Sequence, residues 1–153
     1  MRFEFNIEPV EQARPRATRM GKGIRLYDPK KVTVYKQQLG YLARQAMQER
    51  GLEPYDGPLE VSMEFYRPVQ TSIGKKERDR RLSGVHRPTV KPDLDNYIKS
   101  TSDALNGIIW ADDNLIISLE AKKFYAERPH LTVEIRRPTG EILVRTAAFG
   151  GGN

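Results

Sequence analysis

The side chains best suited to chemistry in this sequence are acids gathered around one predicted helix. Asp93 and Asp95 stand two residues apart, Lys99 follows one helical turn later, and the pair Asp112 and Asp113 comes soon after the helix. Several carboxylates that converge on one point repel one another unless a cation lies between them. A site built from oxygen ligands alone suits Mg²⁺ or Mn²⁺. The cluster therefore predicts a divalent metal site.

The helix that carries these acids is predicted from about Asp93 to Leu105. Its apolar and small residues recur at intervals of three and four, which is the spacing of one helix face. Asp93 is a natural N-cap, because its carboxylate can accept hydrogen bonds from the free backbone N–H groups of the first turn. Asn106 and Gly107 supply the C-terminal stop.

Asp95, Lys99 and Asp103 are spaced by four residues and share one face of this helix, away from its apolar face. The simpler interpretation of such a row is a solvent-exposed face whose acids stabilise the helix dipole. Two acids at the helix start and a further acidic pair after its end carry more negative charge than capping requires. We therefore favour the metal site and keep the exposed face as the alternative.

The composition excludes several classes of protein. The chain has 153 residues, no cysteine and only two histidines, which excludes disulfide bonds and nearly excludes a conventional zinc site. No signal peptide is visible, and no apolar run approaches the roughly 18 residues that a membrane span needs. We expect one soluble, cytoplasmic domain with no membrane partner and no nucleotide cofactor.

Positive charge is concentrated in two segments. Residues 14–36 contain eight Lys and Arg and one acid, and residues 67–91 contain eight against two, although the formal net charge of the whole chain is only +6. The acids therefore lie mainly elsewhere, including the predicted site. A charged loop is often only a solvated surface, but two such segments in a chain with a pI near 9.6 favour nucleic acid as the partner.

Side chains in both basic segments are predicted to contact DNA. Arginine suits phosphate because its guanidinium fork matches phosphate oxygens and stays charged at any working pH. The predicted DNA-binding residues are Arg14, Arg16, Arg19, Lys75, Lys76, Arg80, Arg81 and Arg87.

Alternation of apolar and polar residues predicts four strands. They cover residues 2–8, 59–66, 115–124 and 131–135, and the last two are predicted to form an antiparallel hairpin. In the third of these strands, the residues predicted to point inward are Leu115, Ile117, Leu119 and Ala121.

A long helix is predicted from Asp28-Pro29 to about Gly51, with the acid as its cap and proline at its first position. Residues 11–25 contain glycines and a proline without helical periodicity, which predicts a mobile basic loop. Residues 74–82 predict a short charged helix. The sum is an α+β domain, in which a small mixed or antiparallel sheet of about four strands packs with two main helices.

The C-terminal end of the chain is predicted to contribute little to this domain. Residues 141–145 are predicted to form a last short strand or a dimer contact. Residues 147–153 are small and rich in glycine, so we expect a flexible tail and assign residues 1–146 to the domain.

The order of several motifs resembles the RusA family of Holliday-junction resolvases. The motifs are Arg14-Pro15-Arg16 ahead of the Tyr27-Asp28-Pro29 turn, Lys91-Pro92-Asp93-Leu94-Asp95-Asn96 with Lys99, Asp103-Ala104-Leu105-Asn106-Gly107-Ile108-Ile109-Trp110 with Asp112-Asp113, and Lys122-Lys123 ahead of the final strand. The resemblance covers residues from about 3 to 137. It implies a phage- or prophage-encoded homodimeric endonuclease that cuts four-way DNA junctions in the bacterial cell or nucleoid, with Mg²⁺ or Mn²⁺ as its cofactor.

The resemblance also implies roles for individual residues. The implied catalytic residues are Asp93, Asp95, Asp113 and Lys99, with the three acids as the metal ligands. Asp112 is the alternative to Asp113, but adjacent side chains in extended backbone point opposite ways, and we favour Asp113. Asp103 also matches a recurrent acid of the family, and we interpret it as orienting Lys99.

The same residues have suitable chemistry when taken alone. In-line attack of water on a phosphodiester builds negative charge on phosphoryl oxygens, and a carboxylate-held divalent ion can polarise the phosphate and lower the pKa of the water. Lys99 is placed to pair with that charge or to position the water. The products would be a 5′-phosphate and a 3′-hydroxyl. A four-way junction has approximate two-fold symmetry, so its paired cuts suit a homodimer with one site per subunit.

The principal alternative is a non-catalytic DNA-junction-binding module, which explains the basic segments but not the acidic cluster. A calcium-binding loop that starts at Asp93 fails, because its sixth and twelfth positions are Ile98 and Ala104 instead of glycine and glutamate. An Asp-x-Asp phosphatase fails too, because residues 89–92 do not form the buried apolar strand that it needs before the motif.

Overall fold

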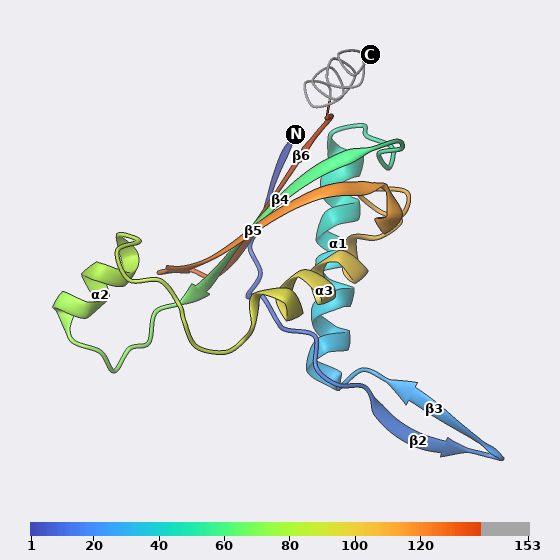
Figure 1. The fold of residues 1–153 in the computed structure, drawn as a ribbon, viewed down its shortest axis with the longest axis horizontal. Helices are drawn as coiled ribbons and strands as arrows, with labels where there is room; N and C mark the ends of the chain where they lie inside the picture. The colour runs from blue at the N-terminus through green and yellow to red at the C-terminus, as the bar shows by residue number, and fades with distance from the viewer. Residues whose placement is uncertain (139–153) are drawn as a thin grey trace, which may run out of the picture.

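A four-stranded mixed sheet with two helices on one face forms the body of the protein in the computed structural model, which describes residues 1–138 (Figure 1). A two-stranded arm and a third helix project from this body (Figure 1). The elements are β1 (Arg2–Phe5), β2 (Arg16–Met20), β3 (Gly23–Tyr27), α1 (Lys30–Glu49), β4 (Leu59–Pro68), α2 (Lys75–Leu82), α3 (Leu94–Leu105), the 3₁₀ turn η1 (Asp113–Leu115), β5 (Ile116–Ala126) and β6 (His130–Arg136). The predicted α+β class is confirmed.

The core lies between the sheet and helices α1 and α3. Alternate residues of β4 point into it and are at most 2% exposed, namely Leu59, Val61, Met63 and Phe65. The predicted apolar stripe of α1 is confirmed, with Val32, Tyr35, Leu39, Ala43 and Met47 buried. The side chain of Trp110, which follows α3, is completely buried in the same core. Within residues 1–138, no helix is long and apolar enough to cross a membrane.

The predicted hairpin of the last two strands is wrong. The strand order is β1-β6-β4-β5, so β4 lies between β5 and β6. β4 pairs in parallel with β5 and antiparallel with β6, and β1 pairs antiparallel with β6. A local pattern of alternation defines which residues share a face, but it does not define which strands pair. β4 and β6 take the two central places, and β1 and β5 form the edges.

The predicted inward face of β5 is only partly covered. Leu119 is opposite Val61 and Ala121 is opposite Met63, so they lie on the core side of the sheet. Because β5 is an edge strand, helices α1 and α3 do not cover all of it. Ile117 is 58% exposed and Leu119 is 42% exposed. Leu115 and Ala121 are partly buried against the core, as predicted.

The start of α1 differs in detail from the prediction. Pro29 occupies the N-cap position, one residue before the place predicted for it, and the helix begins at Lys30 without a side-chain cap. The carboxylate of Asp28 does not cap the helix. Instead it accepts hydrogen bonds from Lys36 Nζ at 2.8 Å and from Gln12 Nε2 at 2.9 Å.

The predicted mobile basic loop at residues 11–25 is wrong, because most of it belongs to a hairpin. β2 and β3 pair antiparallel, and Met20 is opposite Gly23 across a turn in which Gly21 has a φ of +59°. Every residue of both strands is exposed. Neither face of this hairpin packs on the core, so even the apolar residues of β3 are exposed. We call β2 and β3 the arm.

The remaining predictions are confirmed or fall outside the described residues. The short charged helix is present as α2. The predicted strand at residues 2–8 is shorter, because β1 ends at Phe5. The predicted strand or dimer contact at residues 141–145 and the predicted tail at residues 147–153 lie outside residues 1–138.

One buried hydrogen bond links the two helices of the body and gives a test of their packing. The hydroxyls of Tyr35 and Thr101 lie 2.8 Å apart. Tyr35→Phe leaves the Thr101 hydroxyl without this partner, so we expect the free energy of unfolding in urea to fall by about 1 kcal/mol. Tyr41→Phe is the matched control, because Tyr41 lies on the same helix but is 65% exposed. Equal stability of the two variants would contradict this account of the α1–α3 contact.

Candidate functional site

Helix α3 presents the predicted row of charges on its exposed face. Asp95, Lys99 and Asp103 are all exposed. The opposite face is buried, and Tyr97 on that face stacks on Phe65 of β4 with ring centroids 5.1 Å apart. The packing of one face therefore fixes the direction in which the charged face points.

Asp93 occupies the N-cap position of α3, as predicted, but its carboxylate does not act as a cap. Its backbone carbonyl accepts from the N–H of Tyr97 at 3.3 Å. Within residues 1–138, the Asp93 carboxylate accepts no hydrogen bond that caps the helix. Capping therefore does not account for this exposed carboxylate, which remains available to a ligand.

The sheet holds the backbone that leads into α3. Lys123 Nζ on β5 donates to the carbonyl oxygens of Val90 at 3.3 Å and Pro92 at 3.1 Å. Arg67 Nη1 on β4 donates to the carbonyl oxygen of Lys91 at 2.8 Å. These two cations fix the residues just before Asp93. The role of Lys123 was not predicted from the sequence. The signal for it was a lysine on the core side of β5, where it is opposite Phe65 of β4.

The carboxylate of Asp113 is held by a buried indole. Trp110 Nε1 donates to Asp113 Oδ1 at 2.6 Å. The backbone N–H of Asp113 donates to Asn106 Oδ1 at 3.0 Å. Because Trp110 is completely buried, its N–H has a fixed direction and sets the orientation of the partly buried Asp113 side chain.

The electrostatics of Asp113 connect it to the charged face of α3. Burial raises the pKa of Asp113, and the negative charges of Asp103 and Asp112 raise it further, whereas the Trp110 hydrogen bond and the positive charge of Lys99 oppose the shift. Asp113 therefore lies within the electrostatic reach of Asp103 and Lys99. Negative charge that raises a carboxyl pKa in this way would also attract a cation.

Asp112 has a different role from Asp113. Its backbone is extended, and Asp112 Oδ1 accepts from the N–H of Asn114 at 2.9 Å, which caps the 3₁₀ turn η1. The carboxylates of the two neighbouring acids thus accept from different donors, Trp110 for Asp113 and the backbone of Asn114 for Asp112. This arrangement supports the choice of Asp113 as the functional acid of the pair.

Asp103 pairs with a residue that the sequence did not indicate. Its carboxylate forms an ion pair with Lys36 of α1 at 3.2 Å, and Lys36 also pairs with Asp28 at 2.8 Å. Within residues 1–138, Asp103 forms its ion pair with Lys36 and not with Lys99. No contact among these residues therefore supports the interpretation that Asp103 orients Lys99. The hydrogen bond from Lys36 lowers the pKa of Asp28, burial opposes it, and the charge of Lys99 adds to the lowering.

Two of the predicted DNA-binding arginines contact β5, and a third, Arg80, pairs with Glu77 within α2 at 3.6 Å. Arg81 pairs with Glu77 at 3.0 Å and lies over the ring of Tyr125 at 4.7 Å. Arg87 Nε donates to the carbonyl oxygen of Lys123 at 3.0 Å and lies over the ring of Phe124 at 4.1 Å. These contacts hold α2 and the following loop on β5.

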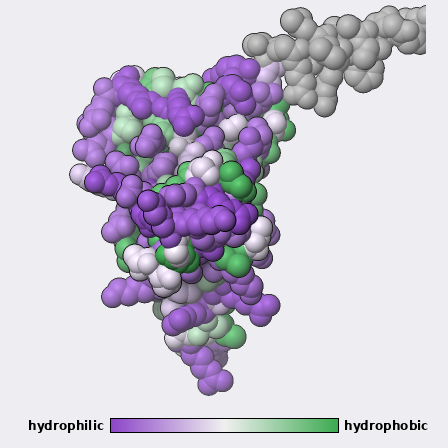
Figure 2. Space-filling view, turned by 90° about the vertical axis from the view of Figure 1, so that its left-hand side faces the viewer, coloured by the Kyte–Doolittle hydropathy of each residue, from purple (hydrophilic) through white to green (hydrophobic). Residues whose placement is uncertain are grey.

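The other cations of this segment are more open. Lys75, Lys76 and Arg80 are exposed. Figure 2 views the molecule from the α2 side and shows that hydrophilic residues cover most of this face. These three side chains remain predicted DNA contacts, as do Arg14, Arg16 and Arg19 at the other basic segment. Arg16 and Arg19 lie on β2 and are exposed.

The predicted metal ligands come from two places, the start of α3 and the turn η1. Within residues 1–138, no group of three or more Asp, Glu, His or Cys side chains is arranged to hold a metal ion. The set of Asp93, Asp95 and Asp113 therefore stays a prediction. The donors suit a hard divalent ion, because all three are carboxylates.

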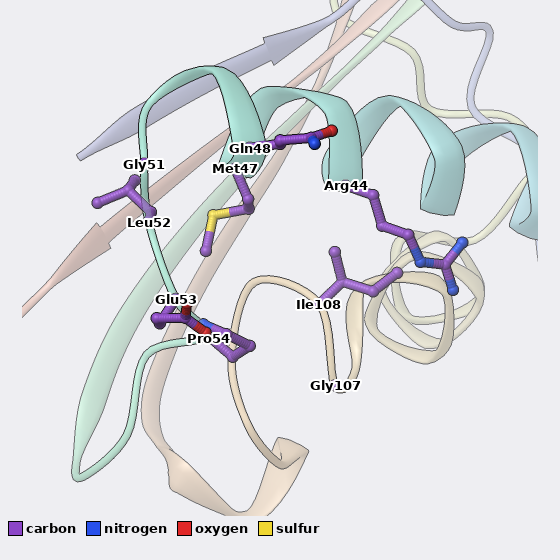
Figure 3. Close-up of a pocket in the computed structure, with 9 residues that line it drawn as sticks. All are labelled: Arg44, Met47, Gln48, Gly51, Leu52, Glu53, Pro54, Gly107 and Ile108. Carbon is purple, nitrogen blue, oxygen red and sulfur yellow. The ribbon is translucent and has the colours of Figure 1, made fainter.

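A pocket of about 440 Å³ lies between the C-terminal end of α1 and the loop after α3 (Figure 3). Met47 and Ile108 point into this space (Figure 3). Its charged lining residues are Arg44 and Glu53, and the predicted acids do not line it. We therefore place the candidate site at the exposed face of α3 instead of in this pocket.

The hydrogen bond between Trp110 and Asp113 can be tested by titration. Because this bond lowers the pKa of Asp113, its loss in Trp110→Phe is expected to raise that pKa. Carboxyl-carbon NMR of the wild type and the variant would measure the shift, with the exposed Asp79 as the internal reference. An Asp113 pKa that stays the same or falls would contradict the proposed role of Trp110.

Comparisons with known proteins identify the family to which the chain belongs. The family model described as endodeoxyribonuclease RusA matches residues 6–136. The chain is 38% identical over 138 residues to the uncharacterized protein YqaN of Bacillus subtilis strain 168, a match that covers 89% of this chain and 95% of YqaN. It is 28% identical over 142 residues to the crossover junction endodeoxyribonuclease RusA of Lactococcus phage r1t, covering 88% of this chain and 98% of the phage protein. With most of its length matched, the chain belongs to the RusA endodeoxyribonuclease family.

Proposed function

We propose that this protein is a structure-specific endodeoxyribonuclease that resolves four-way DNA junctions by paired, metal-dependent hydrolysis of phosphodiesters. The observation that carries the proposal is geometric: Trp110 and Asn106 hold Asp113 beside the end of α3, the helix whose exposed face carries Asp95 and Lys99. Membership of the RusA family supports nuclease activity, and the name of the phage relative supports a crossover junction as the substrate.

In this proposal, Asp93, Asp95 and Asp113 hold Mg²⁺, for which Mn²⁺ can substitute. When bound, such an ion polarises the phosphate and lowers the pKa of the attacking water. Lys99 pairs with the negative charge that develops on the phosphoryl oxygens, an interaction that is strongest in the transition state. The products are a 5′-phosphate and a 3′-hydroxyl.

Several other side chains would keep these groups in position. Trp110 directs the Asp113 carboxylate, and Lys123 and Arg67 hold the backbone before Asp93. Lys36 ties α1 to Asp103 on the charged face of α3. The geometry of the site would then depend on the sheet, α1 and the buried indole together.

The proposed assembly is a homodimer. A four-way junction has approximate two-fold symmetry, and its resolution needs two cuts. A two-fold dimer brings one site to each of the two strands that are cut. The basic segments would contact phosphates, and affinity would fall steeply with salt because counterions are released on binding.

Cleavage of a synthetic four-way junction and of a linear duplex, each with Mg²⁺ or EDTA, tests the proposal. Wild-type protein is expected to make paired nicks in the junction when Mg²⁺ is present, and to make none in EDTA or in the linear duplex. Asp95→Asn and Lys99→Ala are each expected to lower the rate by about 100-fold or more while retaining junction binding, because each removes charge from the site. Asp79→Asn is the matched control, since Asp79 is an exposed acid on α2.

Two outcomes would contradict the proposal. Cleavage by Lys99→Ala at the wild-type rate would remove the lysine from the mechanism. Tight junction binding by the wild type with no cutting in Mg²⁺ or Mn²⁺ would favour a non-catalytic junction-binding module. The absence of a preformed group of three acids among the described residues is the observation in favour of that module.

A further inference from the structure

The arm formed by β2 and β3 has no partner in the described part of the chain that covers either of its faces. All ten of its strand residues are exposed, and it projects away from the sheet and helices (Figure 1). A two-stranded ribbon alone is at best marginally stable in water. We therefore asked which partner the two faces of the arm would fit.

The two faces of the arm differ in chemistry. Residues paired across antiparallel strands lie on the same face. Ala17 is opposite Leu26 and Arg19 is opposite Ile24, so one face is mainly apolar. Ile24 is 72% exposed and Leu26 is 66% exposed on this face. On the narrow lower projection in Figure 2, where the arm lies, hydrophobic and hydrophilic residues are adjacent.

The other face of the arm carries two arginines and is called the basic face. On it, Arg16 is opposite Tyr27, Thr18 is opposite Arg25, and Met20 is opposite Gly23 beside the turn. Over the whole segment of residues 14–27 there are five Lys and Arg and no acid. This charge fits a polyanion. A second copy of the chain is a poorer fit, because the apolar groove beside the base of the arm is lined by Lys30 and Lys31 with a single acid, Glu8.

Both ends of the arm are tied to the candidate site. Before the arm, the backbone N–H of Gln12 donates to the carbonyl oxygen of Asn96 on α3 at 2.9 Å. After it, Asp28 pairs with Lys36, which also pairs with Asp103 on the charged face of α3. The direction of the arm is therefore coupled to the helix that carries the candidate catalytic residues.

We propose that the arm enters the branch point of the DNA, with its apolar face against exposed base-pair faces and its basic face against the phosphates of the adjoining duplex. This inference rests on the proposed function and deepens it, because it names the element that distinguishes branched DNA from linear DNA. A two-stranded ribbon is narrow enough to enter a major groove of DNA. Each five-residue strand spans about 17 Å, so the arm can reach across a groove that is roughly 12 Å wide.

The two different faces are the reason for choosing a branch point. At a branch, duplexes lie on both sides of an inserted ribbon, and base pairs at the crossover expose apolar faces on which a wedge of Ile and Leu can pack. A linear duplex covers only one side of a ribbon and keeps its base pairs stacked. The arm therefore gains more contact on branched DNA than on linear DNA.

Binding in EDTA tests this inference without cleavage. The apolar face is removed in the double variant Ile24→Ser and Leu26→Ser, whose side chains are exposed and lie outside the core. We expect this variant to bind a four-way junction about tenfold more weakly or worse, on the scale of lost base packing, and to bind a linear duplex within about twofold of the wild type. Tyr41→Ser is the matched control, because Tyr41 is 65% exposed and lies outside the arm and both basic segments.

The basic face is tested separately by Arg16→Ala with Arg25→Ala. Each phosphate contact contributes about 0.9 to the slope of log affinity against log salt, so the slope for the junction is expected to fall by nearly two. An unchanged slope would overturn the assignment of this face to phosphate.

Three further outcomes would overturn the inference. The apolar variant could bind the junction as tightly as the wild type. This result would contradict the role of the arm and leave the proposed function intact. Its molecular mass by light scattering could fall along with its affinity, which would assign the apolar face to a second copy of the chain. Equal binding of junction and linear duplex by the wild type would instead contradict the proposed function and the inference together.

Discussion

The hydrogen bond from the indole of Trp110 to the carboxylate of Asp113 is the contact on which the candidate site depends. A completely buried indole N–H needs an acceptor, and the acceptor here is an acid at the edge of the core. The packing of Trp110 therefore sets the direction of the carboxylate that we propose as a metal ligand. Burial and the nearby acids raise the pKa of Asp113, while Lys99 and the indole lower it. The core and the chemistry of the site are linked through this one bond.

The rest of the site is positioned by cations from other elements. Lys123 on β5 and Arg67 on β4 bind the backbone that leads into α3, and Lys36 on α1 joins Asp28 to Asp103. Each of these cations sits beside carbonyl oxygens or carboxylates that would otherwise face solvent or one another. Positive charge in this protein thus has two uses, since some cations build the site and others, on the arm and on α2, lie open to a polyanion.

Local features of the fold could be predicted from the sequence, and long-range features could not. The helix with Asp95 and Lys99 on one face was predicted because its periodicity lies within twelve residues. The pairing of β5 with β4 was missed because alternation specifies faces and not partners. The arm was missed because neither of its faces packs on the core. Asp28 was explained as a cap, and its link through Lys36 to the site depends on tertiary packing.

The most direct test of this account compares the two neighbouring acids of η1. Four-way junction cleavage in Mg²⁺ would be measured for the wild type, Asp113→Asn and Asp112→Asn under identical conditions. The account predicts that Asp113→Asn lowers the cleavage rate by about 100-fold or more, because it removes a carboxylate from the site. It predicts that Asp112→Asn cuts near the wild-type rate, because Asp112 caps η1. Full activity of Asp113→Asn, or a loss confined to Asp112→Asn, would contradict the account.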